Sequence, residues 1–289
     1  VFEDIFAKCL LCGACSKACP RDLDIVSRVM ETRSGFSAVY GSHGYEKMLA
    51  RKVLAKPELL HGARIMGNVA AKMLSNLLPA QSGLRLKLAM FDGKFDGLIG
   101  RKEKDLPVVN EENEELVYFP GCSTSYLYPG IRGATHQLFN HLGYNLIVPE
   151  KLKCCGLAFE AAGDFDTARQ SGRNNIDALF ETQGPILVTC GSCWAHLINY
   201  PHLFTEGEVY HKKAVQVADR VVEASVFLLS LVEKIPFSGH KEERELRIFY
   251  HDPCHMRNEH DLTLEPRKLL EMIPGARLLE LEDGPQCCG

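Results

Sequence analysis

Apolar residues recur at helical spacing through the first third of the chain. The stretch 22–90 is rich in Leu, Met and Ala, and its pattern predicts two or three helices, with Pro57 and Pro79 as breaks. A polar stretch with glycine and many charges follows at 92–116 and predicts a linker. The pattern therefore separates a helical N-terminal part from a remainder of different texture.

Short apolar runs alternate with amphipathic stretches after this linker. Strands are predicted where the runs LVYF, YNLIV and PILV occur, at 116–119, 144–148 and 185–188. The segments 133–143 and 164–183 have helical spacing and lie between these runs. Such alternation favours an α/β structure with a parallel sheet. Ligands of such folds gather beyond the carboxyl ends of the strands.

The last part of the chain repeats this pattern. The segment LRIFYHDPC at 246–254 echoes LVYFPGC at 116–122, and ARLLELEDGPQCCG at 276–289 echoes YNLIVPEKLKCCG at 144–156. Two related units of about 130 residues are the simplest explanation. Between them, the amphipathic stretch from about His211 to 235 predicts one long helix with a core-facing stripe of Val and Leu.

Composition and charge exclude several classes of function. The 289 residues have an ordinary apolar fraction of 46% and 24% charged residues, so a folded globular chain is expected. The net charge of −4 lacks the basic surface of a nucleic-acid binder, so no nucleic-acid partner is expected. No apolar run is long enough to span a bilayer.

Twelve cysteines are the unusual feature of this composition, and they fall into three groups. A disulfide framework suits a short secreted domain rather than a chain of this size. Thiolates gathered for metal fit better and favour a reducing, cytoplasmic setting. The groups are Cys9, Cys12, Cys15 and Cys19; Cys122, Cys154, Cys155, Cys190 and Cys193; and Cys254, Cys287 and Cys288.

The first group has the spacing C-x2-C-x2-C-x3-C-P, from Cys9 to Pro20. This run is typical of ferredoxins that hold a cubane [4Fe–4S] cluster through thiolates. Zinc sites usually pair two C-x2-C turns instead. Because the fourth cysteine of such a run serves another cluster in two-cluster ferredoxins, we expect a second run upstream of the present Val1.

The middle group has the pattern C-x31-C-C-G-x33-C-x2-C. Adjacent cysteines reach one metal centre only from a sharp loop, which Gly156 would permit. Five thiolates are one more than a structural zinc site uses. A catalytic dithiol would need only Cys190 and Cys193. The remaining interpretation is an iron–sulfur site of unusual form.

These motifs, FPGC…CCG…CGSC, resemble the cysteine-rich CCG domain. The domain occurs in tandem in the catalytic subunit of heterodisulfide reductase and in the iron–sulfur subunits of glycolate oxidase and lactate utilisation enzymes. The resemblance implies a noncubane [4Fe–4S] cluster on Cys122, Cys154, Cys155, Cys190 and Cys193. It also implies a fold of tandem α/β CCG domains preceded by an α-helical ferredoxin-type domain.

The resemblance divides the chain into three domains. They are a ferredoxin-type helical domain at 1–115, a first CCG domain at 116–240 and the start of a second at 241–289. The second copy supplies Cys254, Cys287 and Cys288 as metal ligands, but the sequence stops before its C-x-x-C pair. The repeat step places that pair about 35 residues beyond Gly289.

Five further side chains lie close to these cysteines. His251 and Asp252 precede Cys254, and capping of a turn or helix is favoured for them over cluster tuning or proton transfer. Trp194 is expected to pack beside the cluster, and surface or capping positions are expected for His196 and His255.

Several clusters without any organic-cofactor motif indicate an electron carrier. No G-x-G-x-x-G follows a predicted strand. The resemblance implies the iron–sulfur subunit of a 2-hydroxy-acid dehydrogenase complex for lactate or glycolate. Its expected partners are a flavoprotein subunit and a quinone-reducing membrane subunit, at a cytoplasmic location that could be peripheral on the membrane's inner face. The alternative is a heterodisulfide reductase-like subunit that reduces a disulfide or quinone at a noncubane cluster.

Overall fold

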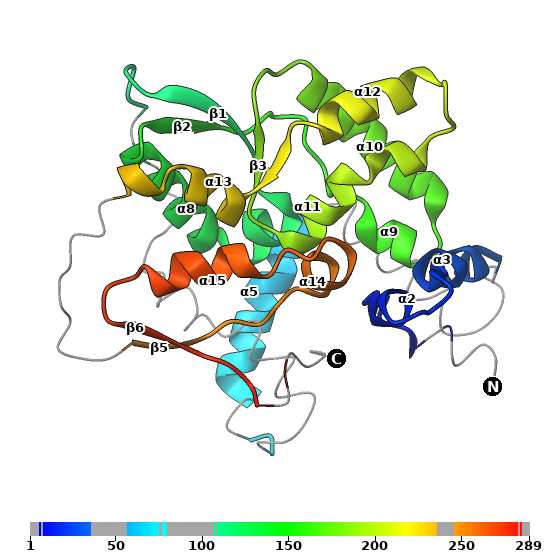
Figure 1. Cartoon of the computed structure of the whole chain (residues 1–289), viewed down its shortest axis with the longest axis horizontal. Coiled ribbons are helices and arrows are strands. Elements are labelled where there is room, and N and C mark those ends of the chain that lie inside the picture. The colour runs from blue at the N-terminus through cyan, green and yellow to red at the C-terminus, as the bar shows by residue number, and fades with distance from the viewer. Residues whose placement is uncertain are drawn as a thin grey trace.

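A four-stranded parallel sheet forms the centre of the protein (Figure 1). Its order is β2-β1-β3-β4, so the chain begins at an inner strand and crosses over to build both sides. The computed structural model describes residues 6, 8–35, 57–74, 77–79, 107, 109–235, 246–282 and 284. The strands are β1 (Glu114–Phe119), β2 (Tyr144–Ile147), β3 (Ile186–Val188) and β4 (Val221–Glu223).

Helices cover both faces of this sheet, as the near-continuous apolar strands require. Val117 and Phe119 of β1 lie in one buried cluster with α10, α11 and α12, whereas Leu116 and Tyr118 lie in another with α8 and α13. The covering helices are α8 (Pro129–His141), α10 (Phe165–Phe180), α11 (Gly191–Ile198), α12 (Val209–Ala218) and α13 (Ala224–Ser230). The predicted α/β structure with a parallel sheet is thereby confirmed.

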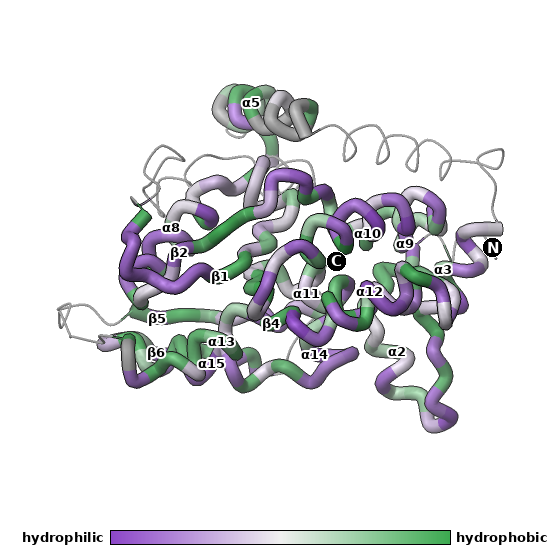
Figure 2. Tube along the Cα trace, turned by 90° about the horizontal axis from the view of Figure 1, so that it is seen from above, coloured by the Kyte–Doolittle hydropathy of each residue, from purple (hydrophilic) through white to green (hydrophobic). Residues whose placement is uncertain are grey.

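A second, two-stranded parallel sheet repeats the first step of this architecture. Its strands, β5 (Leu246–Phe249) and β6 (Ala276–Leu279), are mostly hydrophobic (Figure 2). The Leu246 N–H donates to the Gly275 carbonyl at 2.9 Å, just as the Glu114 N–H donates to the Gly143 carbonyl at 3.0 Å. The helices α14 (Cys254–Glu259) and α15 (Leu264–Glu271) lie between β5 and β6 in the sequence. The internal repeat is therefore visible in strand pairing and register.

The described N-terminal residues include three helices. The helices are α2 (Ala14–Lys17), α3 (Ile25–Gly35) and α5 (Pro57–Leu74). Pro57 is the first residue of α5, and Pro79 lies beyond the end of this helix at Leu74. Most of the predicted linker lies outside the described residues, but its last part belongs to β1. No helix among the described residues has both the length and the apolar character needed to cross a membrane.

The single long helix predicted from His211 is wrong. The chain leaves α12 at Ala218, forms β4 beside β3, and enters α13 at Ala224. The β-branched pair Val221 and Val222 suits the open edge of the sheet. The Glu223 side chain then accepts the N–H groups of Ser225 and Val226, which starts the new helix. The helical spacing was misleading because pairing of Val221 and Val222 with β3 overrides it.

Candidate metal centre

The first cysteine group lies on a tight loop and on the short helix α2. Gly13 turns the chain with φ 74°, a conformation that favours glycine, and Cys15 is exposed while the other three are half-buried. The Arg33 guanidinium donates hydrogen bonds to the carbonyls of Cys9, Phe6 and Ala161. One side chain of α3 therefore holds this loop and attaches it to the end of α9 (Leu157–Ala161).

The five cysteines of the middle group lie beyond the carboxyl ends of three neighbouring strands. Cys122 follows β1, the Cys154–Cys155 pair follows β2, and Cys190 follows β3, with Cys193 one helical turn into α11. Each thiol perturbs the pKa of its neighbour in the order Cys122, Cys154, Cys155, Cys193, Cys190, so the five side chains lie close together. The structure thus brings all five together, as the sequence predicted from their positions at strand ends.

The pKa is lowered for some thiols of this group and raised for others. Hydrogen bonds from Cys154 and then Cys193 lower the pKa of the buried Cys155 to about 5. A hydrogen bond from Cys193, aided by backbone N–H groups at the start of α11, lowers the pKa of Cys190 to about 6. Hydrogen bonding to Cys154 and burial raise the pKa of Cys122. The neighbouring thiols and backbone N–H groups therefore favour the thiolate form at Cys155 and Cys190, which is the form that binds metal.

Two glycines make room for this gathering of sulfur atoms. A Cβ on Gly121 would lie 2.9 Å from the Cys193 sulfur, which is closer than carbon and sulfur can approach. Gly156 has φ 102° and lets the chain turn from the cysteine pair into α9. The sequence pattern predicted the role of Gly156, but that of Gly121 depends on a contact with a residue far along the chain.

A buried polar network fixes the Cys154–Cys155 loop. The Asn175 amide and the Ser171 hydroxyl both donate to the Cys154 carbonyl, at 3.0 and 2.5 Å. The Tyr200 hydroxyl donates to the Cys155 carbonyl at 2.7 Å and accepts from Asn175 at 3.0 Å. Sequence reasoning missed these three residues. The available signal was the pair Ser171 and Asn175, polar residues four apart on the otherwise apolar face of α10.

The third cysteine group is described only at Cys254, because Cys287 and Cys288 lie outside the described residues. Cys254 is half-buried and is the first residue of α14. Asp252 before it is 2% exposed and forms an ion pair with Arg267 of α15. That pair connects the start of α14 to α15, whereas capping was the role favoured for Asp252; Pro253 is the N-cap of α14, and no side chain caps the helix.

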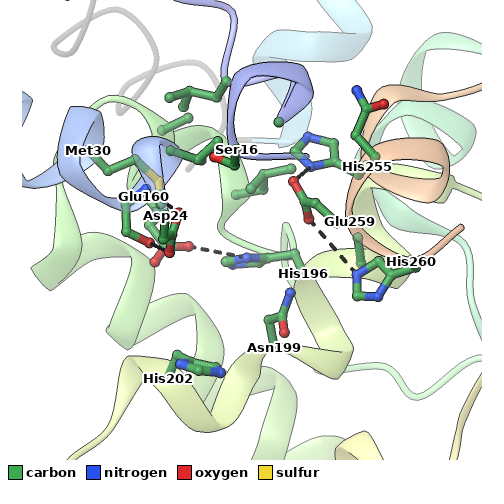
Figure 3. A pocket seen from close by; sticks show the side chains of 18 of the residues that line it. Ser16, Asp24, Met30, Glu160, His196, Asn199, His202, His255, Glu259 and His260 are labelled. Atoms are coloured by element: carbon green, nitrogen blue, oxygen red, sulfur yellow. Dashed lines mark hydrogen bonds and ion pairs between the residues drawn. The ribbon is translucent and has the colours of Figure 1, made fainter. Parts of the chain in front are cut away.

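The aromatic and histidine residues near the cysteines contact other side chains, and the burial of His196 (Figure 3) corrects one prediction. Trp194 packs edge-on against His260, with ring centroids 4.9 Å apart. His255 hydrogen-bonds Glu259 at 2.7 Å on one side of α14. His196 is not a surface residue, because it is 4% exposed, with its Nδ1 3.2 Å from Glu160. Burial lowers the pKa of His196 to about 4.

Helix α14 contacts both of the cysteine groups that precede it in the chain. Its Asn258 amide donates to the Cys12 carbonyl at 2.6 Å. Its start packs on α11, where a Cβ on Gly191 would lie 2.5 Å from the Met256 sulfur and 3.2 Å from the Pro253 Cβ. Helix α14, which begins with Cys254, therefore contacts both the Cys9–Cys19 loop and the turn that carries Cys190 and Cys193.

Within the described ranges, no three His, Cys, Asp or Glu side chains surround a single point as one metal ion would require. That criterion applies to a single metal ion and not to a cluster, in which the thiolates bind different iron atoms. The residues present fit such a group. Soft thiolates at strand ends, lowered thiol pKa values and glycines at the points of closest approach are the features that iron–sulfur ligation needs.

Comparison with known proteins gives a family match over much of the chain. The model of the cysteine-rich domain named CCG matches residues 116–198 and 248–289. The two matched segments contain β1 to α11 and β5 to the C-terminal cysteines. No solved structure matches.

Curated relatives are similar over most of the chain. Lactate utilization protein A of Shouchella clausii is 30% identical over 59% of this chain and 70% of its own length. The probable glycolate oxidase iron–sulfur subunit of Bacillus subtilis is 24% identical over 99% of this chain and 67% of its own length. One subunit of the dihydromethanophenazine:CoB–CoM heterodisulfide reductase of Methanosarcina barkeri is 25% identical, over 97% and 77% respectively. The chain spans about half the length of three further relatives, at 49%, 47% and 48%.

Proposed function

Because this chain belongs to the iron–sulfur proteins built on the cysteine-rich CCG domain, we propose that it conducts electrons between protein partners as a subunit of an oxidoreductase complex. The donor is a flavoprotein that oxidises a 2-hydroxy acid of the lactate or glycolate type. The acceptor is a quinone or another carrier, reached through a membrane subunit. The chain works in the reducing cytoplasm, on the inner face of the membrane.

Two clusters account for the described cysteines. Cys9, Cys12, Cys15 and Cys19 hold a cubane [4Fe–4S] cluster in a ferredoxin-type domain at 1–115, and the five-thiol group holds a [4Fe–4S] cluster of noncubane form in the first CCG domain at 116–240. Such clusters supply one-electron transfer. Cys254, Cys287 and Cys288 are the ligands contributed by the second CCG unit at 241–289. The low thiol pKa values of Cys155 and Cys190 support the five-thiol assignment.

The observation that carries this proposal is the position of α14. The helix contacts the Cys9–Cys19 loop through Asn258 and the Cys190–Cys193 turn through Pro253 and Met256. Two cysteine-bearing segments from distant parts of the sequence thus contact one short helix, which itself begins with Cys254. A carrier needs its redox groups close together, whereas a set of structural metal sites does not.

The chain's own residues serve this role by positioning. Arg33 holds the first loop against α9, and Asn175 with Tyr200 holds the cysteine pair in its turn. The Tyr200 and Asn175 side chains are completely buried, Cys155 is buried as well, and Cys154 is half-buried. A rigid protein environment lowers the reorganisation energy of each electron transfer.

The decisive experiment follows cluster absorbance in the cluster-loaded chain. Reduction should require both a flavoprotein partner and its hydroxy acid, and the chain alone should leave the hydroxy acid unchanged. Omitting either component serves as the control. Oxidation of the hydroxy acid by the isolated chain would contradict the proposal.

A second candidate is direct reduction of a disulfide at the five-thiol site. The observation in its favour is the similarity to a heterodisulfide reductase subunit over 97% of this chain. In that case the isolated, cluster-loaded chain with an artificial reductant should turn over a disulfide, and Cys155→Ser should abolish turnover. Turnover that survives this substitution would exclude the five-thiol site as the place of reaction.

A further inference from the structure

Helix α5 exposes several large apolar side chains. Met66 is 75% exposed and Met73 is 69% exposed, and Leu77 beyond the end of the helix is also exposed. Single exposed apolar residues are common on proteins, whereas a contiguous group of them marks a surface for interaction. The apolar face of α5, as we name this group, consists of Leu59, Ile65, Met66, Val69, Met73, Leu74 and Leu77.

The spacing of these residues places them along one side of the helix. Leu59, Met66 and Met73 are seven residues apart, so they follow one another almost in line. Val69 lies three residues after Met66 and four before Met73, which puts it on the same side. The apolar face therefore runs along nearly the whole length of α5.

Another side of α5 attaches the helix to the protein near the five-thiol site. Ala71 is buried, and the helix lies against the short turn η2 (Ser123–Leu127), which directly follows Cys122. In Figure 2, α5 lies at the outer edge of the molecule. Contact with η2 thus holds the apolar face outward, one short turn away from a cysteine of the five-thiol group.

The sequence around α5 is basic, although the chain as a whole is acidic. Residues 46–91 include eight Lys or Arg residues and two Glu residues, whereas the net charge of the whole chain is −4. The remainder of the chain is therefore strongly acidic. A negatively charged surface attracts the segment around α5 and repels the remainder, so charge by itself turns α5 toward such a surface.

The composition of the apolar face favours lipid over a protein partner. It consists of Leu, Ile, Val and Met, without the Trp, Tyr or Arg residues that most often anchor protein interfaces. Its side chains also offer none of the hydrogen-bonding groups that a specific protein interface uses. A coiled coil with a second copy needs three or more heptads, whereas Leu59 to Met73 spans two and includes Gly62 at an inner position.

We propose that the apolar face of α5 inserts into the surface of a membrane that contains anionic lipids, with the helix parallel to the membrane plane. The apolar side chains enter the boundary between headgroups and acyl chains, and the basic charge of the segment adds attraction to the headgroups. The inference goes beyond the proposed function, which reaches the membrane through another subunit, because it assigns direct lipid contact to this chain. It also turns the five-thiol site, through η2, toward the membrane.

Flotation with lipid vesicles tests this proposal. The cluster-loaded chain should float with vesicles that contain phosphatidylglycerol beside phosphatidylcholine. It should bind at least about tenfold more weakly to vesicles of phosphatidylcholine alone, because these lack the negative charge that attracts the basic segment. Added salt should weaken binding to the anionic vesicles, because it screens the same attraction.

A pair of matched variants makes this test specific to α5. The double substitution Met66→Gln with Met73→Gln removes apolar character, keeps the charge of the chain and retains a good helix former, and we expect at least about tenfold weaker vesicle binding. The control, Val209→Gln with Leu264→Gln, changes apolar residues of similar exposure, 69% and 60%, on α12 and α15. It should bind as the parent chain does. Circular dichroism and iron content check that both variants fold.

The possible outcomes separate this proposal from the electron-carrying function. Vesicle binding needs no electron donor, so it can be measured even if no partner reduces the clusters. Normal cluster reduction by the flavoprotein, together with no binding to anionic vesicles, would overturn the membrane assignment alone. Vesicle binding that the Met66 and Met73 substitutions leave unchanged would also overturn it. So would a dimer or a flavoprotein complex that these substitutions disrupt while the parent chain stays off the vesicles, because the face would then belong to a protein interface.

Discussion

At the scale of single residues, Asn175 shows how a side chain without chemistry of its own supports a metal site. It is completely buried and joins the Cys154 carbonyl to the Tyr200 hydroxyl, and its own oxygen accepts the Lys153 N–H at 2.7 Å. Two hydrogen bonds of this amide therefore hold the backbone on either side of Cys154, and the third is made to Tyr200. A buried polar group of this kind is costly to leave without partners.

Asn175→Ala should lower the free energy of unfolding by about 1–3 kcal/mol, because it leaves buried backbone groups unpaired. It should also lower the iron content of the five-thiol site, since the cysteine loop loses its support. Urea unfolding and iron quantitation measure the two effects. Asn174→Ala, which removes a longer hydrogen bond of 3.4 Å with Gln170, is the matched control and should change neither. Equal effects of both substitutions would refute the role of the buried amide.

His136 illustrates a residue-scale effect of pH. Burial, followed by the charge of Arg132, lowers its pKa from 6.5 to about 4 in the folded chain. Between these two values the unfolded chain binds a proton that the folded chain does not. This histidine therefore contributes stability at neutral pH that is lost as the pH falls from about 6.5 towards 4.

His136→Gln should make the free energy of unfolding less sensitive to pH in that window. The change in slope is at most about 1.4 kcal/mol per pH unit, which corresponds to one proton. Denaturant unfolding at several pH values between 5 and 7 measures it. His141→Gln, at an exposed position near the end of the same helix, should keep the parent slope. A parent slope in the His136 variant would show that other groups control the acid sensitivity.

At the scale of elements, the contact between α11 and α14 joins the two parts of the chain that carry repeated cysteines. Gly191 permits it, because any larger residue would meet Met256 and Pro253. The Trp194–His260 ring contact extends the same interface. Because Gly191, the first residue of α11, has no side chain, α14 can pack closely against α11.

Gly191→Ala should destabilise the chain by about 1–3 kcal/mol through overpacking, because Pro253 cannot move away as a flexible side chain could. Gly133→Ala on α8 is the control, since its Cβ would meet nothing within 4 Å; it should be neutral or stabilising by about 0.5–1 kcal/mol. Thermal unfolding of the parent and the two variants tests this, and an unchanged Gly191→Ala variant would contradict the close packing.

The broken helix between 209 and 230 is a second lesson at the element scale. Its Val and Leu stripe matched helical spacing, yet Val221 and Val222 pair with β3 instead. The edge of the sheet beside β3 offers backbone hydrogen bonds to this segment. The local sequence pattern does not reveal that this partner strand is present. Tertiary packing overrides helix propensity where the two conflict.

At the scale of the whole molecule, the two described cysteine sites lie in different layers of structure. One is on the N-terminal loop before α3, and the other is beyond the carboxyl ends of the central sheet. They share the contact with α14 but no thiol. Damage to one site should therefore leave the other able to assemble.

Cys154→Ser should remove the cluster of the five-thiol site and spare that of the Cys9–Cys19 loop, while Cys12→Ser should do the reverse. Paramagnetic resonance, combined with iron quantitation, distinguishes the two clusters in each variant. The double variant sets the background level. Loss of both signals after either single substitution, with the fold intact by circular dichroism, would mean that the sites form one unit.

Local patterns were sufficient for the cysteine groups and for most elements. The strands at β1, β2, β3, β5 and β6 were predictable because short apolar runs between turn residues have few other uses, and the internal repeat followed from the echoed motifs. The family was also predictable, because adjacent cysteines followed by glycine at such spacing are rare. These features depend on neighbours within a few residues, which is the range over which sequence periodicity carries information.

Only the tertiary structure determined what surrounds the cysteines. Asn175 and Tyr200 are 21 and 45 residues away from the carbonyls they hold, and Asn258 is 246 residues away from Cys12. The burial of His196 and the space that Gly191 leaves for α14 likewise result from packing of distant segments. Hydrogen bonds and contacts of this range are set by chain topology, so a linear pattern of polar and apolar positions does not specify them.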